Sequence, residues 1–448
     1  MKLTLTEIVE YLKIEMPTPI EGIVTSVEFD SRLVTKGSLF VPLAGARDGH
    51  EFVQAAIEKG AVATLWSRPV TEAPEGIIVL PVADVKVAFQ QLAVYYLEKI
   101  APKVVAITGS NGKTTTKDMT EAVLAQQYQT YKTQGNYNND LGMPYTILHM
   151  PESTEILILE MGMNHFDEIA FLSKLAKPDA AAITMIGEAH IENLGSRAGI
   201  AQAKMEIVSG LAADGLLLVP ADEPLLTPMI AELAQNVATF GLGQGTIQGQ
   251  VESESKNETV FTVDGVRFTI PVLGSYNVTN ALIAYGLGRH FNLPVEKIVT
   301  GLATFQLTKN RTEWKKAANG ADLLSDVYNA NPTAMGLVLD SFGHLPVEGR
   351  RVAVLADMLE LGADSQQMHA QMASHIGASY DCLFLYGEQM QALRDVLATT
   401  DLEVHHFGTV QKADLVAALT AFIQPKDSVL FKGSNGMGLA AVVDALMK

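Results

Sequence analysis

A glycine-containing loop between an apolar run and a Lys-Thr pair is the part of the sequence with the clearest chemical meaning. The run Val104–Ile107 leads into Thr108-Gly109-Ser110-Asn111-Gly112-Lys113-Thr114-Thr115-Thr116. Glycines in such a loop let successive backbone N–H groups face phosphates at the start of a helix, where the helix dipole also favours negative charge. We therefore predict a polyphosphate-binding loop, with Lys113 directed to the terminal phosphates and the Thr114 hydroxyl to an accompanying Mg²⁺.

The loop departs from the full Walker pattern at one position, because Ile107 stands where that pattern has a glycine five residues before Gly112. A glycine turn that only caps a helix is the simpler alternative. The order of strand, loop, Lys-Thr pair and a predicted helix over Lys117–Gln126 favours a nucleoside triphosphate site instead. The predicted phosphate-binding residues are Gly109, Ser110, Asn111, Gly112, Lys113, Thr114 and Thr115.

Two further candidate ligands follow apolar runs that are typical of buried strands. Glu160 ends the run Ile156–Glu160, and His190 follows the run Ala180–Thr184. Because ligands bind beyond the carboxyl ends of strands in doubly wound sheets, both side chains are placed to hold Mg²⁺. A helix-capping carboxylate and a hydrogen-bonding loop histidine are the alternatives. Lys204, in the predicted helix Gly199–Leu211, is by its spacing an ordinary helical lysine.

Composition narrows the class of protein. The 448 residues are 48% hydrophobic and 18% charged, which is typical of a well-packed globular protein of two to four domains. The sequence has neither the ~20 uninterrupted apolar residues of a membrane span nor an apparent signal peptide, so we expect a cytoplasmic protein. The formal net charge of −18 argues against non-specific nucleic-acid binding.

The single cysteine and the lack of an apparent nucleophile set narrow the possible chemistry further. The lone Cys382 cannot form an internal disulfide and is predicted to be a core residue. The sequence offers no apparent Ser-His-Asp or Cys-His nucleophile set and no cysteine cluster for zinc. A reaction through a covalent enzyme intermediate is therefore not required.

The alternation of strands and helices predicts an α/β protein of three domains. We expect a small mixed α/β N-terminal domain over residues 1–98 and a C-terminal Rossmann-like α/β domain over residues 309–448. Between them, residues 99–308 form a domain of the phosphate-loop type, with helices on both faces of a mostly parallel sheet. The predicted strands are Val24–Phe29, Ser38–Leu43, Val104–Thr108, Ile156–Glu160, Ala180–Thr184, Leu216–Val219, Val237–Phe240, Val260–Val263, Arg267–Ile270, Leu323–Val327, Val352–Ala356, Cys382–Tyr386 and Ser428–Lys432.

A series of short motifs adds a resemblance to a known family. The motifs, in chain order after the phosphate loop, are Gln134–Asn139, Glu160–Met163, Gly187–His190, Gly274–Asn280, Asn310–Trp314, Asp326–Pro332, Asp357–Gly362 and Lys432–Ser434. Together they resemble the ATP-dependent Mur ligases of peptidoglycan synthesis, over nearly the whole chain. Within that family the pattern is most similar to the members that join D-alanyl-D-alanine to UDP-N-acetylmuramoyl-tripeptide.

The resemblance implies roles for the residues around the nucleotide. Lys113 and Thr114 would hold the ATP phosphates and Mg²⁺, Glu160 and His190 would be metal ligands, and Lys204 is similar to a lysine that the family carbamylates to bind a second Mg²⁺. Asn280 matches the asparagine that reads adenine, Arg311 an arginine that reaches the phosphates from the third domain, and Asp326 an acid that holds the ribose. Fork-like guanidinium contacts to phosphate and carboxylate contacts to ribose hydroxyls agree with these roles.

The resemblance also implies where the other substrates bind. The residues expected near the dipeptide are Asn329, Asn331, Asp357 and Lys432, and those expected near the UDP-sugar peptide are Asn138, Asn139, Ser31, Arg32, Arg47, Asp48 and His50. Turn formation at Asn-Pro and exposed salt bridges in loops are the alternatives. Two positions depart from the family: Tyr276 replaces a frequent histidine, and Asn435 follows Ser434 where an arginine is common.

The implied reaction is amide formation driven by ATP through an acyl phosphate, with Lys113, Glu160, His190, Lys204 and Arg311 as the catalytic residues. The expected partners are small molecules only, and the expected state is a monomer. Two other classes stay open: a related ligase such as folylpolyglutamate synthase, and a phosphate-loop switch that uses ATP to gate a partner. The runs Asn329–Pro332 and Asp357–Gly362 favour the Mur-type enzyme over the first of these.

Overall fold

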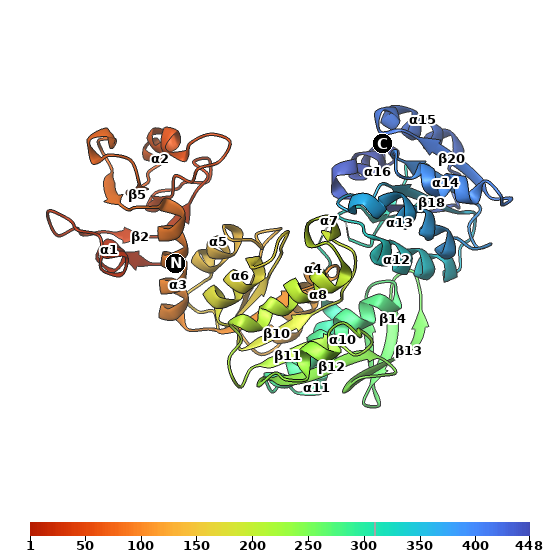
Figure 1. Cartoon of the computed structure of the whole chain (residues 1–448), viewed down its shortest axis with the longest axis horizontal. Coiled ribbons are helices and arrows are strands. Elements are labelled where there is room, and N and C mark those ends of the chain that lie inside the picture. Colours follow the sequence, from red (N-terminus) through yellow and green to blue (C-terminus); the bar gives the residue numbers. More distant parts are fainter. Residues whose placement is uncertain (309–310) are drawn as a thin grey trace.

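Three lobes follow one another along the chain (Figure 1). This computed structural model describes residues 1–308 and 311–448. In the view of Figure 1 the N-terminal lobe lies at the left, the central lobe at the bottom and the C-terminal lobe at the right. The predicted boundary at 308/309 and Asn310 of the quoted motif lie outside the described residues.

The N-terminal lobe is built on a small parallel sheet. Its order is β3 (Ser26–Glu28), β4 (Ser38–Phe40), β5 (Ala63–Trp66) and β6 (Ile78–Pro81). The first predicted strand, Val24–Phe29, is in fact two short strands, because β2 (Ile23–Val24) leaves this sheet to pair with β1 (Leu3–Thr4). The helices of the lobe are α1 (Leu5–Leu12), α2 (Val53–Glu58) and α3 (Val85–Ile100).

Helix α3 joins the first lobe to the second through a shared hydrophobic core. Phe89, Leu92 and Tyr96 on α3 are fully buried, and the Tyr96 hydroxyl donates a hydrogen bond to the carbonyl oxygen of Met150 at 3.0 Å. One continuous cluster of buried side chains runs from Leu3 to Leu226. The first two lobes therefore share one hydrophobic cluster, although the part of the first lobe around α2 keeps a smaller cluster of its own.

This shared core predicts how truncation of the Tyr96 side chain changes the stability of the protein. Tyr96→Ala should lower the free energy of unfolding by about 3–5 kcal/mol, because a large buried ring leaves a cavity. Tyr96→Phe keeps the ring and should lose only the hydrogen bond, about 1 kcal/mol. Denaturant unfolding and calorimetry would measure both changes. Unfolding of Tyr96→Ala at the wild-type denaturant concentration would contradict this account of the junction.

The central lobe contains a nine-stranded sheet of order β15-β14-β13-β12-β11-β10-β7-β9-β8. Its strands are β7 (Lys103–Thr108), β8 (Thr130–Lys132), β9 (Ile156–Glu160), β10 (Ala180–Ile183), β11 (Leu216–Pro220), β12 (Asn236–Leu242), β13 (Ile247–Glu254), β14 (Thr259–Val263) and β15 (Val266–Ile270). All pairs from β8 to β13 are parallel, and β13, β14 and β15 pair antiparallel. The prediction of a mostly parallel sheet is thus confirmed.

Helices cover both faces of the central sheet. Val105 and Ile107 of β7 face one cluster, with α4 (Lys113–Leu124), α10 (Ser275–His290) and α11 (Val295–Thr304). Val104 and Ala106 face the other, with α5 (Gly142–His149), α6 (Glu168–Ala176) and α8 (Arg197–Met205). Alternate side chains of one strand thus face two layers, which explains the uninterrupted apolar run of β7.

The C-terminal lobe has a six-stranded sheet of order β16-β17-β21-β18-β19-β20. The strands are β16 (Glu313–Lys316), β17 (Asp322–Asp326), β18 (Arg351–Ala356), β19 (Cys382–Tyr386), β20 (Glu403–Phe407) and β21 (Ser428–Lys432), and only β16 is antiparallel. The helices of this lobe are α12 (Pro332–His344), α13 (Ser365–Gln371), α14 (Gln391–Leu397), α15 (Lys412–Phe422) and α16 (Leu439–Leu446). The parallel α/β architecture agrees with the Rossmann-like prediction.

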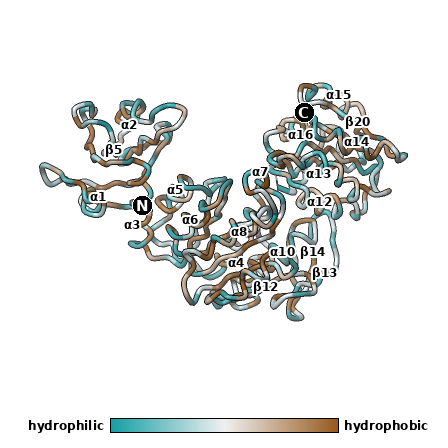
Figure 2. The backbone as a smooth tube through the Cα atoms, viewed as in Figure 1, coloured by the Kyte–Doolittle hydropathy of each residue, from teal (hydrophilic) through white to brown (hydrophobic). Residues whose placement is uncertain are grey.

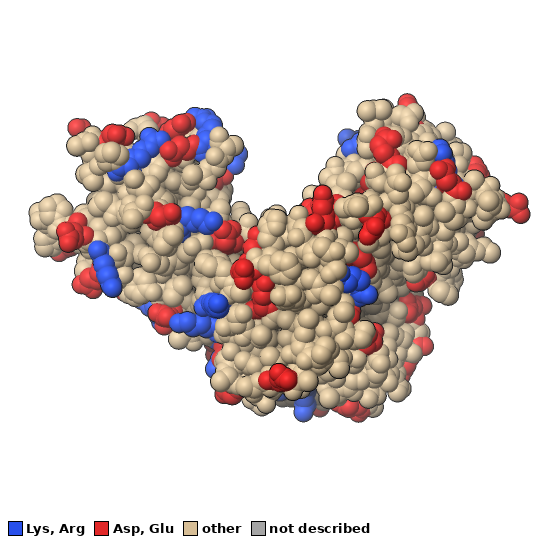
Figure 3. Space-filling model, viewed as in Figure 1, with Lys and Arg blue, Asp and Glu red and all other residues tan. Residues whose placement is uncertain are grey.

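Apolar stretches lie mainly in the buried strands and their covering helices (Figure 2). Among the described residues, no helix combines the length and the apolar character needed to cross a membrane. A wide notch separates the N-terminal and C-terminal lobes above the central lobe (Figure 3). Acidic side chains are frequent around this notch in the view shown.

Candidate active site

The loop after β7 is fixed by the neighbouring strand β10. The Ser110 N–H donates to the Met185 carbonyl at 3.0 Å, and the Thr184 hydroxyl donates to the Asn111 carbonyl. Gly112 has a φ of +80°, and a Cβ there would lie 2.5 Å from the Asn280 amide oxygen. Glycine is therefore required at position 112 by both conformation and space. The helix α4 begins at Lys113, four residues earlier than predicted.

Lys113 is folded back over the loop. Its Nζ donates a hydrogen bond to the Gly109 carbonyl at 2.7 Å. Burial lowers the pKa of Lys113, and the Glu160 carboxylate opposes that effect. The amine therefore lies at the mouth of the phosphate loop, where a polyphosphate would meet it first.

Glu160 ends β9, the strand beside β7, and its carboxylate faces α4. It accepts hydrogen bonds from the Thr114 hydroxyl at 2.9 Å and from the Asn138 amide at 2.8 Å, and Lys117 Nζ lies 3.6 Å away. Burial opposes ionisation of Glu160, but the cations Lys117 and Lys113 outweigh it and leave its pKa lowered. Glu160 is therefore a buried carboxylate held in its charged form.

The donor set at this point fits a hard divalent cation. A hydroxyl and a carboxylate oxygen, from Thr114 and Glu160, meet at the start of α4 directly below the phosphate loop. Mg²⁺ prefers such oxygen ligands and usually shares them with substrate phosphates. The predicted pair Thr114 and Glu160 is thus brought together.

His190 is not brought to Glu160 in this arrangement. It follows β10 with a φ of +64°, and its Nδ1 lies 2.6 Å from Oε2 of Glu360 in the C-terminal lobe. Burial lowers the pKa of His190, and Glu360 opposes this effect. The imidazole therefore bridges two lobes, and its predicted role as a metal ligand remains a prediction.

Lys204 differs from an ordinary helical lysine. Its residue is only 2% exposed, on the inner side of α8. Across residues 1–308 and 311–448, no carboxylate lies within ion-pair distance of its amine, and burial together with Lys113 places its pKa far below the usual range. A buried amine without a counter-charge is costly unless it is neutral or modified.

Lys113 connects these groups electrostatically. Its charge lowers the pKa values of Glu160, His190 and Lys204, and the charge of Arg311 acts on Lys113 and Glu160 in turn. The five predicted catalytic residues therefore lie in one electrostatic neighbourhood, although they come from five separate segments of the chain.

Arg311 enters this neighbourhood from the C-terminal lobe. Its guanidinium stacks over the Tyr328 ring, with the guanidinium carbon 4.1 Å from the ring centroid. Its Nε is buried, and among the described residues it has no hydrogen-bond partner. An unpaired buried guanidinium N–H is a donor available to an anionic ligand.

A cavity of about 410 Å³ lies beside the phosphate loop. Gly112, Thr184, Tyr276 and Asn280 are among its lining residues, together with Thr333 from the C-terminal lobe. The Asn280 amide is partly engaged, because its oxygen accepts from the Thr116 hydroxyl at 3.0 Å and its nitrogen donates to Asn277 at 3.1 Å. Asn280 therefore borders a nucleoside-sized space.

The predicted dipeptide residues gather at the carboxyl ends of the C-terminal strands. Lys432 is buried and bonds both Asp326, at 2.7 Å, and the Asn329 carbonyl, at 2.8 Å. Asn331 caps α12 by accepting from the Ala334 N–H at 2.9 Å. These bonds tie the loop 327–331 to the sheet, so part of the work of these residues is structural.

The Asp357 carboxylate is likewise held by hydrogen bonds within the C-terminal lobe. It accepts from the N–H groups of Gln389 at 3.2 Å and Met390 at 2.9 Å, and burial raises its pKa. This carboxylate fixes the turn before α14. A direct contact with the dipeptide remains a prediction.

The first-lobe candidates form a separate group. Arg32 is exposed and paired with Asp30, and Ser31, which stands between these two residues, is half-buried. Arg47 is paired with Glu51 at 2.8 Å. Asp48 accepts from the His50 ring at 2.7 Å and also from Arg68. Four of these five polar groups are therefore satisfied locally.

Asn138 and Asn139 lie between the first and second lobes. Both line a cavity of about 680 Å³ together with Lys86, Gln90 and Phe166. Asn139 also caps α5, because its side-chain oxygen accepts from the Gly142 N–H at 2.8 Å. The cavity connects with the Glu160 carboxylate through Asn138, whose side-chain amide donates to it at 2.8 Å.

Two features of the site were missed at the level of sequence. Lys117 is buried against Glu160, and its position one turn after Lys113 on the same helix was the available signal. Glu188 accepts from the Thr333 N–H at 3.0 Å and from its hydroxyl, and so ties the second lobe to the start of α12. No local sequence pattern marks that contact.

Three family models match successive parts of the chain. They are the Mur ligase family, catalytic domain, over residues 23–96, the Mur ligase middle domain over residues 107–288, and the Mur ligase, glutamate ligase domain over residues 310–435.

Curated relatives match over the full length. The UDP-N-acetylmuramoyl-tripeptide--D-alanyl-D-alanine ligase of Bacillus subtilis (strain 168) is 42% identical, over 100% of this chain and 99% of the relative. The ligase of the same name from Escherichia coli (strain K12) is 34% identical, over 94% of each chain. A crystal structure of MurF from Acinetobacter baumannii superposes with a TM-score of 0.89 at 29% identity, covering 100% of this chain and 99% of that one. The MurF ligase of Thermotoga maritima in complex with ADP gives 0.82 at 25% identity, covering 94% and 97%.

Proposed function

Because this chain belongs to the Mur ligase family, we infer that it is an ATP-dependent ligase of peptidoglycan precursor synthesis. It joins D-alanyl-D-alanine to the terminal carboxylate of UDP-N-acetylmuramoyl-tripeptide. The full-length similarity to ligases of this name carries the conclusion. The position of Lys113, Thr114 and Glu160 at the loop after β7 supports the conclusion, because a cation and two oxygen ligands lie together there.

The reaction has two steps. An oxygen of the tripeptide carboxylate attacks the γ-phosphorus of ATP, the bond to the β-phosphate oxygen breaks, and an acyl phosphate and ADP form. The dipeptide amine then attacks the acyl carbon, the amine loses a proton, and inorganic phosphate leaves. No protein nucleophile is needed, so the enzyme contributes chiefly position and charge.

We assign the charge stabilisation to side chains of two lobes. Lys113 and Arg311 contact the transferring phosphoryl oxygens, where negative charge gathers in the transition state. Thr114, Glu160 and His190 would hold Mg²⁺, with a carbamylated Lys204 at a second ion, and these ions would offset the phosphate charge when bound. Asn280 would recognise the adenine base, and Asp326 would bind the ribose.

The other substrates are assigned by lobe. Residues 1–98, with Ser31, Arg32, Arg47, Asp48 and His50, would bind the UDP part, and Asn138 and Asn139 would position its peptide. Residues 99–308 would bind ATP. Residues 309–448 would bind the dipeptide near Asn329, Asn331, Asp357 and Lys432. We further propose that the enzyme is a cytoplasmic monomer.

Substrate dependence tests the function. Phosphate release from ATP should be sustained only when both UDP-N-acetylmuramoyl-tripeptide and D-alanyl-D-alanine are present, because the amine discharges the acyl phosphate. A folylpolyglutamate synthase would instead require folate and glutamate, and a switch protein would turn over ATP regardless of either acceptor. Either pattern would exclude the assigned activity.

Lys204 offers a test of the carbamate. Lys204→Ala should slow turnover on the order of 10²-fold, because a carboxylate-like group would be lost from the charge network. Formate or acetate should restore part of the activity by supplying a carboxylate to the vacated space. Small alkylamines should not do so, and rescue by amines alone would show that Lys204 acts as an ammonium group. Full activity of Lys204→Ala would remove it from the site.

A further inference from the structure

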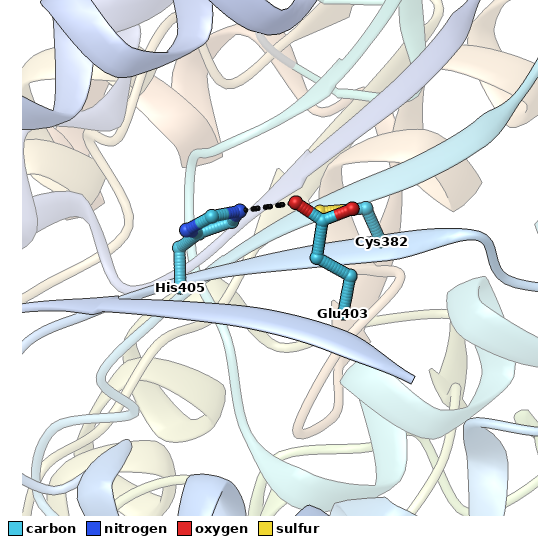
Figure 4. Close-up of side chains that lie close together, drawn as sticks. All are labelled: Cys382, Glu403 and His405. Carbon is cyan, nitrogen blue, oxygen red and sulfur yellow. Dashed lines mark hydrogen bonds and ion pairs between the residues drawn. The ribbon is translucent and has the colours of Figure 1, made fainter. Parts of the chain in front are cut away.

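Three side chains on neighbouring strands of the C-terminal sheet bring a thiol, an imidazole and a carboxylate together (Figure 4). Cys382 begins β19, and Glu403 and His405 lie on the edge strand β20. Cys382 is directly opposite Glu403 in the register, and His405 is opposite Phe384. All three side chains therefore stand on the same face of the sheet, and their ligand atoms lie within 4.8 Å of one another.

We propose that Cys382, Glu403 and His405 form a binding site for a divalent transition metal ion of the zinc type. Thiolate and imidazole are the ligands that Zn²⁺ prefers, a carboxylate oxygen is a common third, and water can take the fourth tetrahedral position. Zinc–ligand bonds of ~2.0–2.3 Å place tetrahedral ligand atoms ~3.5 Å apart. The Nε2 of His405 and the Oε1 of Glu403 are now 2.8 Å apart, so small side-chain rotations would suffice.

The site is distinct from the ATP-dependent chemistry. Asp326 and Lys432 stand at the carboxyl ends of β17 and β21, whereas Cys382 and Glu403 stand at the amino ends of β19 and β20. These two pairs of strands also lie on opposite sides of β18 in the sheet. An ion bound here would join the edge strand to its neighbour rather than touch the reacting groups.

The surroundings hold the imidazole ring in place and leave two of the three side chains reachable from solvent. Cys382 is fully buried and forms the floor, whereas the side chains of Glu403 and His405 are 54% and 40% exposed and open to solvent. The His405 ring stacks on Phe384 at 4.7 Å, and Phe422 of α15 lies edge-on at 6.1 Å. These two rings restrict the imidazole plane, which reduces the ordering needed on binding.

The buried thiol must lose its proton before it can ligate a metal ion. Burial, and then the Glu403 carboxylate, raise the pKa of the Cys382 thiol to about 12. The nearby cation Arg350 acts in the opposite direction on the thiol, and it is paired with Asp427 at 2.7 Å. A bound metal ion would displace the thiol proton, and the carboxylate that opposes a free thiolate would then stabilise the ion.

Cobalt spectroscopy on the full-length protein tests the site. Reduced protein in excess Mg²⁺, which fills oxygen-ligand sites, would be titrated with Co²⁺. Because Cys382 is the only cysteine of the chain, a thiolate-to-cobalt charge-transfer band can arise only here. We expect the band to saturate at one Co²⁺ per chain and to disappear when Zn²⁺ is added.

Matched variants distinguish Co²⁺ binding at this site from non-specific Co²⁺ binding elsewhere on the protein. Cys382→Ala should abolish the band, and His405→Gln and Glu403→Gln, both at exposed positions, should weaken Co²⁺ binding by at least the roughly 10–100-fold that is typical of losing a supporting ligand contact. His375→Gln should bind Co²⁺ normally, since His375 pairs with Asp340 elsewhere in the same lobe. A missing thiolate band at saturating Co²⁺, or unchanged affinity in His405→Gln, would overturn the proposal.

Discussion

Lys113→Ala should slow ligation on the order of 10²-fold or more, equivalent to about 3 kcal/mol of transition-state stabilisation. The amine now bonds the Gly109 carbonyl and lies in the field of Glu160 and Arg311. In phosphoryl transfer, charge develops on the oxygens that such a cation meets, so the loss should appear in kcat as well as in kcat/KM for ATP. Phosphate release with both acceptors present would measure it.

A second lysine provides the control for this variant. Lys174 lies exposed on α6, so Lys174→Ala removes the same charge from the protein without touching the loop. It should retain nearly wild-type kinetics. Thermal melting of Lys113→Ala must match the wild type for the comparison to hold. Near-normal turnover of a folded Lys113→Ala protein would show that the loop has been assigned wrongly.

Arg311→Ala should be at least as damaging, with a loss on the order of 10³-fold in kcat/KM, because an arginine delivered to a phosphoryl group is worth that much or more. Its buried Nε lacks a partner within the described part of the chain, and the Tyr328 ring supports the guanidinium plane. Arg311→Lys should not restore the rate, since an ammonium group cannot reproduce the planar fork. Single-turnover formation of ADP would isolate the first chemical step.

The exposed Arg289 at the end of α10 is the matched control for charge, and Arg289→Ala should be kinetically silent. Tyr328→Leu should show an intermediate loss, because the guanidinium remains but its platform is gone. If Arg311→Ala kept a rate within threefold of the wild type, the C-terminal lobe would not take part in the phosphoryl step.

The parts of the site that could be predicted from sequence are those set by local rules. The phosphate loop follows from glycine conformation and the dipole of the next helix, and Glu160 follows from its place at the carboxyl end of an apolar strand. The structure brings Thr114 and Glu160 within 2.9 Å, as that rule requires. Most central strands were located for the same reason, since continuous apolar runs are typical of parallel strands covered on both faces.

What escaped prediction depends on contacts between distant segments. His190 and Glu360 are in contact although 170 positions separate them in the sequence. The periodicity of apolar residues reports only local structure, so it cannot predict such a contact. The strands β13 and β20 are half exposed and polar, so their composition does not distinguish them from loops. The burial of Lys204 likewise depends on how α8 packs and not on its own sequence.

The unbroken core from Leu3 to Leu226 has a mechanical consequence. Only two residues separate the end of α3 at Ile100 from the start of β7 at Lys103, which leaves almost no chain to act as a hinge. We therefore expect the first two lobes to move as one rigid body. Any opening and closing between substrates would then be a displacement of the C-terminal lobe, and the contact between His190 and Glu360 would be broken and re-formed in each cycle.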